Sequence, residues 1–76
     1  MRKPMPLRNL RRSRTINQAT LASLLGISQQ TLSKYEKGVL TPSVDLQARL
    51  AVILGVSRAD LFPAEVAAEG RERVAS

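Results

Sequence analysis

The sequence contains no cysteine and no histidine. Without cysteine there can be no disulfide framework and no thiolate metal site. Without histidine the chain lacks the commonest general base and the commonest metal ligand. No apolar run approaches the roughly 20 residues of a membrane span, and no apolar stretch follows the basic start to make a signal peptide. We therefore expect a cytoplasmic protein that is not an enzyme and needs no cofactor or metal.

Aromatic residues are also scarce, since the chain has one tyrosine and one phenylalanine, Tyr35 and Phe62. Proteins that bind RNA or single strands stack bases on aromatic side chains, so this class is disfavoured. The 76 residues, 43% of them hydrophobic, suit one small globular domain. A chain this short buries only about 60% of its unfolded surface, which leaves little room for an enzyme's cleft.

Positive charge is abundant and unevenly distributed. The net charge is +6; residues 1–41 hold eight basic residues and one acid, whereas residues 42–76 hold four basic residues and five acids. A basic half beside a nearly neutral half is typical of a protein that binds nucleic acid. A solvated cationic surface and contact with anionic lipid are the alternatives. With so few aromatic residues, the charge favours duplex DNA.

Apolar residues recur at helical spacing and no strand pattern stands out, so we predict an all-α fold. A first helix begins near Leu7, after a basic extended arm of residues 1–6. Four more helices begin after the predicted N-caps Asn17, Ser28, Ser43 and Ser57. Glycines or a proline end the last four helices, at Gly26, Gly38, Gly55 and Pro63. The domain then spans residues 7–62, and residues 63–76 form a flexible or partly helical tail.

The segment from Asn17 to Glu36 has the features of a helix-turn-helix. Two helices meet across the short turn at residues 26–28, and Ala22 is the small residue at the crossing point. Ile27 is expected to fill the angle between the helices. The outward positions of the second helix are polar and none is acidic: Gln29, Gln30, Ser33 and Lys34. Such side chains can hydrogen-bond to base edges in the major groove of DNA.

The spacing of these residues resembles the lambdoid phage repressor and Cro family (the XRE family) of compact five-helix DNA-binding domains. The residues that carry the resemblance run from Leu10-Arg11 and Arg14-Thr15-Ile16-Asn17-Gln18 through Leu21-Ala22, Leu25-Gly26-Ile27-Ser28, Thr31-Leu32-Ser33 and Tyr35-Glu36-Lys37-Gly38 to Pro42-Ser43. Leu50-Ala51, Leu54-Gly55-Val56-Ser57 and Leu61-Phe62 match the end of that domain. The resemblance covers about residues 7–62.

The resemblance implies a role for each position of the motif. Gln18 would touch a phosphate and brace Gln29, which would read adenine through N6 and N7. Gln30 and Ser33 would reach neighbouring bases. The candidate phosphate contacts are Asn17, Gln18, Ser28, Lys34, Lys37, Arg12 and Arg14. Together with Arg8, the last two could instead be a solvated face, and Ser28 is in any case a helix cap.

Two further expectations concern structure and assembly. Arg11 and Glu36 match an ion pair that ties the first helix to the end of the third. Val56, Leu61 and Phe62 are expected in the core, with part of that surface serving as a dimer contact. Tyr35 is expected to be a core residue rather than a base-stacking one.

The leading hypothesis is a sequence-specific transcriptional repressor that binds a palindromic DNA operator as a homodimer. The first alternative is an antitoxin, which would bind a partner protein through residues 64–76 and repress its own operon. The second is a basic helical adaptor that touches membrane or RNA.

Overall fold

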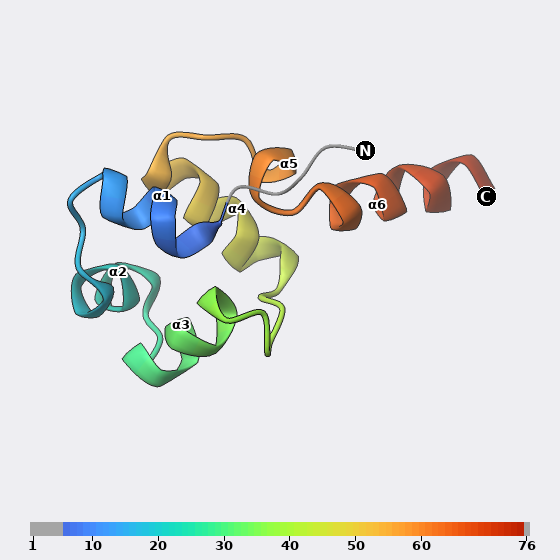
Figure 1. Ribbon diagram of the computed structural model, residues 1–76. Helices are drawn as coiled ribbons and strands as arrows, with labels where there is room; N and C mark the ends of the chain where they lie inside the picture. Colours follow the sequence, from blue (N-terminus) through green and yellow to red (C-terminus); the bar gives the residue numbers. More distant parts are fainter. Residues whose placement is uncertain (1–5, 76) are drawn as a thin grey trace.

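The computed structural model describes the backbone of residues 6–75 and the side chains of residues 6–70. Residues 1–5, which hold most of the expected basic arm, lie outside the described residues. The described part contains six helices and no strand, which confirms the all-α prediction (Figure 1). The helices are α1 (Leu7–Ser13), α2 (Gln18–Leu25), α3 (Gln29–Glu36), α4 (Val44–Leu54), α5 (Arg58–Leu61) and α6 (Pro63–Ala75).

Side-chain caps define where four of the helices begin, as the sequence predicted. The Asn17 side chain accepts a hydrogen bond from the backbone N–H of Thr20 at 2.8 Å. The same bond recurs at the three serines that precede α3, α4 and α5, which are Ser28, Ser43 and Ser57. Each cap satisfies a backbone N–H that has no partner inside its helix.

Glycines in the left-handed conformation end α2 and α4. Gly26 has φ +70° and Gly55 has φ +73°, and both are C-caps. Side chains with a Cβ rarely adopt this conformation, so glycine allows an abrupt stop. Each stop is followed by a partly buried residue, Ile27 or Val56, that packs against the core, and then by the next N-cap serine.

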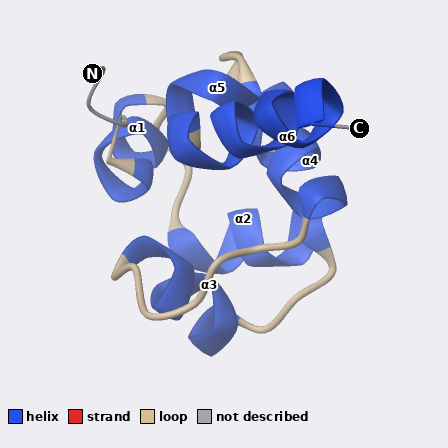
Figure 2. Ribbon diagram, turned by 90° about the vertical axis from the view of Figure 1, so that its right-hand side faces the viewer, coloured by secondary structure: helices blue, strands red, loops and turns tan. Residues whose placement is uncertain are grey.

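The core lies where the helices meet and is mostly leucine. Figure 2 shows α2 and α3 together on one side of the molecule, with α1, α4, α5 and α6 on the other. Leu21, Leu32 and Leu50 have no exposed surface. Val56 and Phe62 pack against the core while partly exposed, and Leu61 is only 5% exposed. Of the three residues of the expected dimer contact, Leu61 is therefore a core residue whose side chain does not lie on the surface, whereas Val56 and Phe62 keep part of their surface exposed.

Helix α6 covers most of residues 63–76, for which the sequence predicts a flexible or partly helical tail. Pro63, which we expected to close the fifth helix, is the first residue of a 13-residue helix. Proline fits this position because the first N–H of a helix has no intrahelical partner, and its fixed φ is helical. The same residue thus ends one helix and begins another. Figure 1 shows α6 extending away from the other five helices, and the Cα trace measures 40 × 21 × 21 Å.

A polar network ties α6 to the domain. The guanidinium of Arg58 on α5 forms a bidentate ion pair with the carboxylate of Glu69 on α6. Hydrogen bonding to Glu69 raises the pKa of Arg58 above its ordinary value. Arg58 Nε also donates to Oε1 of Gln47 at 2.7 Å, and Gln47 Nε2 donates to the carbonyl of Pro42 at 2.9 Å. Gln47 is only 1% exposed, so the network connects α6 to the interior through α4.

Candidate nucleic-acid interface

Helices α2 and α3 form the expected helix-turn-helix. Ala22 is 2% exposed, as a small residue at a helix crossing should be, and Ile27 packs between the helices and the core. On α3, Leu32 points into the core, which leaves the opposite face to solvent. Gln30 and Lys34 on that face are exposed, and so is Gln29, the first residue of the helix. The packing therefore fixes α3 and presents its polar side chains outward.

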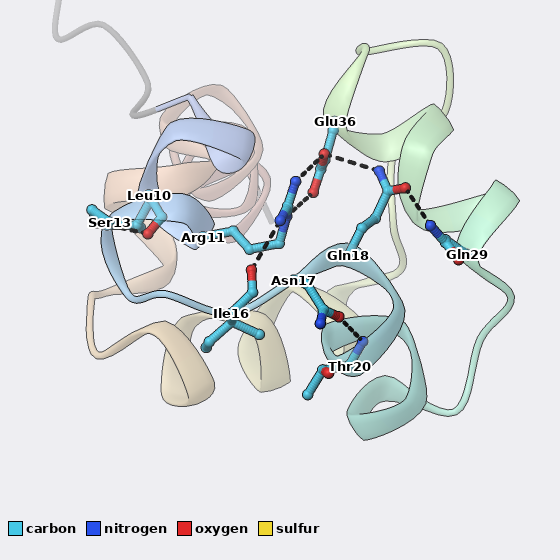
Figure 3. Close-up of polar contacts among 9 residues, drawn as sticks. All are labelled: Leu10, Arg11, Ser13, Ile16, Asn17, Gln18, Thr20, Gln29 and Glu36. Carbon is cyan, nitrogen blue, oxygen red and sulfur yellow. Dashed lines mark hydrogen bonds and ion pairs between the residues drawn. The ribbon is translucent and has the colours of Figure 1, made fainter.

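An ion pair joins α1 to the end of α3, as the resemblance implied. Arg11 Nε donates to Glu36 Oε2 at 2.6 Å, and Arg11 Nη2 donates to Glu36 Oε1 at 3.3 Å (Figure 3). The two side chains are only 8% and 3% exposed. Arg11 Nη1 also donates to the carbonyl of Ile16 at 2.9 Å, just before α2. The guanidinium therefore contacts two other segments of the domain.

Gln18 extends this ion pair to the start of α3. Its Nε2 donates to Glu36 Oε1 at 3.2 Å, and its Oε1 accepts from Gln29 Nε2 at 3.1 Å (Figure 3). A carboxylate can only accept hydrogen bonds, so Glu36 requires Gln18 to present its NH₂ group. The oxygen of Gln18 must then face Gln29, which has to present a donor. The hydrogen bonds that run from Arg11 through Glu36 and Gln18 thus fix the amide orientation of Gln29.

The amide of Gln29 keeps hydrogen-bonding capacity beyond this contact. Its NH₂ group has two donors and uses one on Gln18, and no other hydrogen bond within the described residues engages its side chain. One N–H and the carbonyl oxygen therefore remain for a ligand. A donor beside an acceptor is the pattern that complements N7 and N6 of adenine.

The expected phosphate contacts do not all lie together. A groove of about 330 Å³ separates α1 from α3 and gathers Arg12, Gln18 and Lys37 with the base-reading candidate Ser33. Its complete lining is Arg8, Arg11, Arg12, Gln18, Ser33, Glu36 and Lys37. Asn17 and Ser28 are exposed at the starts of α2 and α3, and Lys34 is exposed on α3. These positions surround the polar face of α3.

Arg14 is directed elsewhere. Its Nε donates to the carbonyl of Leu54 at 2.9 Å, at the end of α4. A cation is favourable there because the last carbonyls of a helix lack intrahelical donors. The structure therefore gives Arg14 a partner within the fold and does not bring it to the groove. The sequence gives little indication of this hydrogen bond, because 40 residues separate Arg14 from Leu54.

The described residues hold no group of three or more potential metal-ligating side chains. None of their helices has the length and apolar character that crossing a membrane requires.

Comparison with known proteins identifies the fold. A helix-turn-helix family model matches residues 7–61, and the chain belongs to this family, of the phage-repressor (XRE) type. It is 36% identical over 55 residues to the cryptic phage CTXphi transcriptional repressor RstR of Vibrio cholerae, covering 72% of this chain and 50% of RstR. It is 38% identical over 56 residues to an uncharacterized HTH-type transcriptional regulator of Methanocaldococcus jannaschii, covering 74% and 85% of the two chains.

The coverage differs among the relatives. The chain spans only 16% of the length of a Methanosarcina barkeri relative, to which it is 38% identical over 53 residues, 70% of this chain. Among solved structures it is similar to the clp gene regulator ClgR of Corynebacterium glutamicum, with a TM-score of 0.69 and 29% identity. That match covers 91% of this chain and 81% of ClgR. The chain thus contains a helix-turn-helix domain of this family and spans only a small part of several relatives.

Proposed function

We propose that this protein is a sequence-specific repressor that inserts α3 into the major groove of duplex DNA. The observation that carries the proposal is the fixed amide of Gln29 on an otherwise free polar helix face. A side chain held in one orientation can discriminate between bases, because a wrong base leaves its donor or acceptor unpaired. The name of RstR as a transcriptional repressor supports repression over activation. Access to DNA also implies a cytoplasmic location, and no part of this role requires enzymatic chemistry.

The positions on and around α3 divide into two roles. Gln29 reads adenine, while Gln30 and Ser33 contact neighbouring bases. Phosphates are contacted from the two helix starts by Asn17, Gln18 and Ser28, where unpaired backbone N–H groups add to the attraction. Lys34, Lys37 and Arg12 supply positive charge beside them. Arg14 is left out, because its guanidinium already binds the end of α4.

Specificity further requires two copies of the domain. One recognition helix reads only a few base pairs, so we propose a two-fold dimer on a palindromic operator, with half-site centres about 34–36 Å apart. Selection of bound sites from random duplex DNA tests this directly. The expected result is an inverted repeat with half-sites one helical turn apart. A selected site without a dyad, bound by one chain at full affinity, would remove the dimer from the proposal.

Replacing Gln29 should separate base reading from general affinity. Gln29→Ala is expected to weaken discrimination at one base pair by about 1–3 kcal/mol and to leave the other positions unchanged. The matched variant is Lys34→Ala on the same helix, which should weaken binding to every duplex alike and lower the salt slope by about one unit. Titrations against operators with single base changes distinguish the two patterns. An equal loss on all sequences for Gln29→Ala would contradict its reading role.

The second candidate function is that of an antitoxin, which would bind a partner protein. The observation that favours it is α6, which is helical and extends away from the other five helices (Figure 1). Co-expression with the product of the adjacent gene, followed by sedimentation analysis, tests this role. A stoichiometric complex that is lost after deletion of residues 71–76 would support it. Sedimentation of the intact chain free of that product would exclude the antitoxin role.

A further inference from the structure

A second, apolar groove lies between α2 and α4. It has a volume of about 320 Å³ and one charged residue in an otherwise aliphatic lining, which consists of Leu24, Ala48, Arg49, Val52 and Ile53. Leu24 is 53% exposed and Val52 is 80% exposed, the highest value among the large hydrophobic residues whose side chains the structure describes. Covering such side chains with a partner's surface is favourable in water, so the apolar groove is a candidate interface.

The apolar groove does not overlap the surface assigned to DNA. None of its lining residues is among the base or phosphate contacts proposed above, and α3 contributes no residue to it. Leu24 lies near the end of α2, whereas Asn17 and Gln18 lie at its beginning. A partner can therefore occupy the apolar groove while α3 lies in the major groove of DNA.

The dimer contact expected from the sequence offers less exposed apolar surface than this groove. Leu61 is buried, and Val56 and Phe62 are partly buried against the core. Two folded protomers can only associate through apolar side chains that the protomer leaves exposed. Among the surfaces described, the apolar groove therefore suits a second copy of the chain better than the surface around Leu61.

The exposed face of α4 carries charges that complement a second copy of the same face. The positions of Asp45, Ala48, Arg49 and Val52 correspond to i, i+3, i+4 and i+7, so the four residues share one side of the helix. Asp45 and Arg49 are exposed, and neither forms an ion pair with any residue whose side chain is described. Arg49 donates only from Nη2 to the carbonyl of Leu24, at 3.4 Å.

An antiparallel arrangement of two α4 helices satisfies both charges. A two-fold axis that crosses α4 near Ala48 reverses the direction of the second helix, and so brings Asp45 of each copy toward Arg49 of the other. Two equivalent ion pairs then form on either side of the axis. A parallel arrangement would instead place like charges beside each other. Alanine at the centre allows the helices to approach closely.

We propose that the apolar groove binds a second copy of this chain, in a two-fold dimer that packs α4 antiparallel against α4 of the other copy. The contact buries Val52 of each copy and pairs Asp45 with Arg49 across the axis. The inference rests on the proposed function in that it assigns a surface to the dimer that a palindromic operator requires. The interface is small, so we expect a dissociation constant on the order of 10 µM.

Sedimentation equilibrium without DNA tests whether the contact forms. Between about 1 and 100 µM the original protein should change from monomer to dimer. Val52→Asp should raise the dissociation constant by about tenfold or more, because it buries a carboxylate beside Asp45 of the other copy. Val39→Asp is the matched control, since Val39 is 67% exposed and lies outside the apolar groove, and it should dimerise like the original protein. A monomer at every concentration, or a dimer that a folded Val52→Asp retains, would overturn the inference.

Charge reversal and cross-linking test the antiparallel arrangement. Asp45→Lys or Arg49→Glu alone makes both ion pairs repulsive and should weaken the dimer, whereas the double variant should recover most of the affinity. The chain has no cysteine, so Ala48→Cys introduces a single thiol near the axis. It should cross-link two copies on mild oxidation, because a disulfide needs Cα atoms within about 7 Å, and Val39→Cys should not. No recovery in the double variant, or no cross-link in Ala48→Cys, would contradict the arrangement.

Duplex binding distinguishes failure of this inference from failure of the proposed function. Val52→Asp should bind the selected inverted repeat about tenfold more weakly than the original protein, and a duplex with one half-site equally well. Equal affinity of the two proteins for both duplexes would remove the apolar groove from the operator dimer and overturn the inference. If the original protein selects no duplex sequence, the proposed function itself fails. A dimer that Val52→Asp disrupts would still support the apolar groove as the surface that binds a second copy.

Discussion

Arg11→Met is expected to lower the free energy of unfolding by about 3–5 kcal/mol. The substitution removes the cation but leaves the carboxylate of Glu36, whose side chain is only 3% exposed. Gln18 would be its one remaining hydrogen-bond donor among the side chains described. A 76-residue domain has a free energy of unfolding of roughly 4–11 kcal/mol, so the loss should be large in urea or thermal unfolding followed by circular dichroism.

The neighbouring arginine provides the control. Arg12 lies on the same helix, is exposed and has no partner among the described side chains, so Arg12→Met should change the free energy of unfolding by no more than about 0.5 kcal/mol. The double variant Arg11→Met/Glu36→Leu removes both charges and should be more stable than Arg11→Met alone. Equal losses for Arg11→Met and Arg12→Met would show that burial of the pair has no energetic consequence.

The double variant also separates stability from DNA reading. Without Glu36, the NH₂ group of Gln18 has no carboxylate to bind, and its orientation toward Gln29 is no longer determined. A folded double variant should therefore lose discrimination at the base pair that Gln29 reads, while its salt dependence stays unchanged. This result would show that the ion pair acts through Gln18 as well as through stability.

Much of the fold was predictable because the signals are local. Asn17 and Ser28 cap helices with bonds to backbone groups three residues away, and Gly26 ends a helix through its own conformation. These interactions depend on neighbours in the sequence and can be read directly from it. Pro63 shows the limit of such reading, because the same residue type stops one helix and starts another. For the segment after it, the sequence alone is compatible with both a flexible and a partly helical tail.

Contacts between distant residues were harder to foresee. Gln47 lies on the buried stripe of α4 with Leu50 and Leu54, and a polar residue at that spacing could have signalled a buried hydrogen-bond network. Its partner Arg58 could not be named without knowing how α4 and α5 pack.

In the candidate site, too, some contacts could be predicted from the sequence and others depend on how the helices pack. The resemblance implied the contact of Gln18 with Gln29 and the ion pair of Arg11 with Glu36. Neither the groove nor the partner of Arg14 followed from the motif, because both depend on how α1 crosses the other helices. The sequence does not distinguish the three arginines at positions 8, 12 and 14. Only the packing of α1 directs Arg8 and Arg12 toward the groove and Arg14 toward the end of α4.

Leu32→Ala should also be strongly destabilising, by about 2–5 kcal/mol, because Leu32 is the fully buried residue on the inner side of the recognition helix. The loss combines the removed apolar contact with the cavity left behind. Leu24→Ala is the matched control, since this leucine is on the adjacent helix and is 53% exposed. It should cost less than about 1 kcal/mol. Chemical denaturation of both variants checks the difference, and similar losses would mean that α3 is not held by the core.

Operator DNA should partly restore Leu32→Ala, because a ligand that binds only the folded state stabilises it by mass action. At a free operator concentration 100 times its Kd, the stabilisation is about 2.7 kcal/mol. Gln29 is exposed and hydrogen-bonds to Gln18, whereas Leu32 is buried in the core, so the variant that folds on DNA should still discriminate at the base pair assigned to Gln29. Loss of that discrimination in the DNA-bound state would show that Leu32 also positions the reading face.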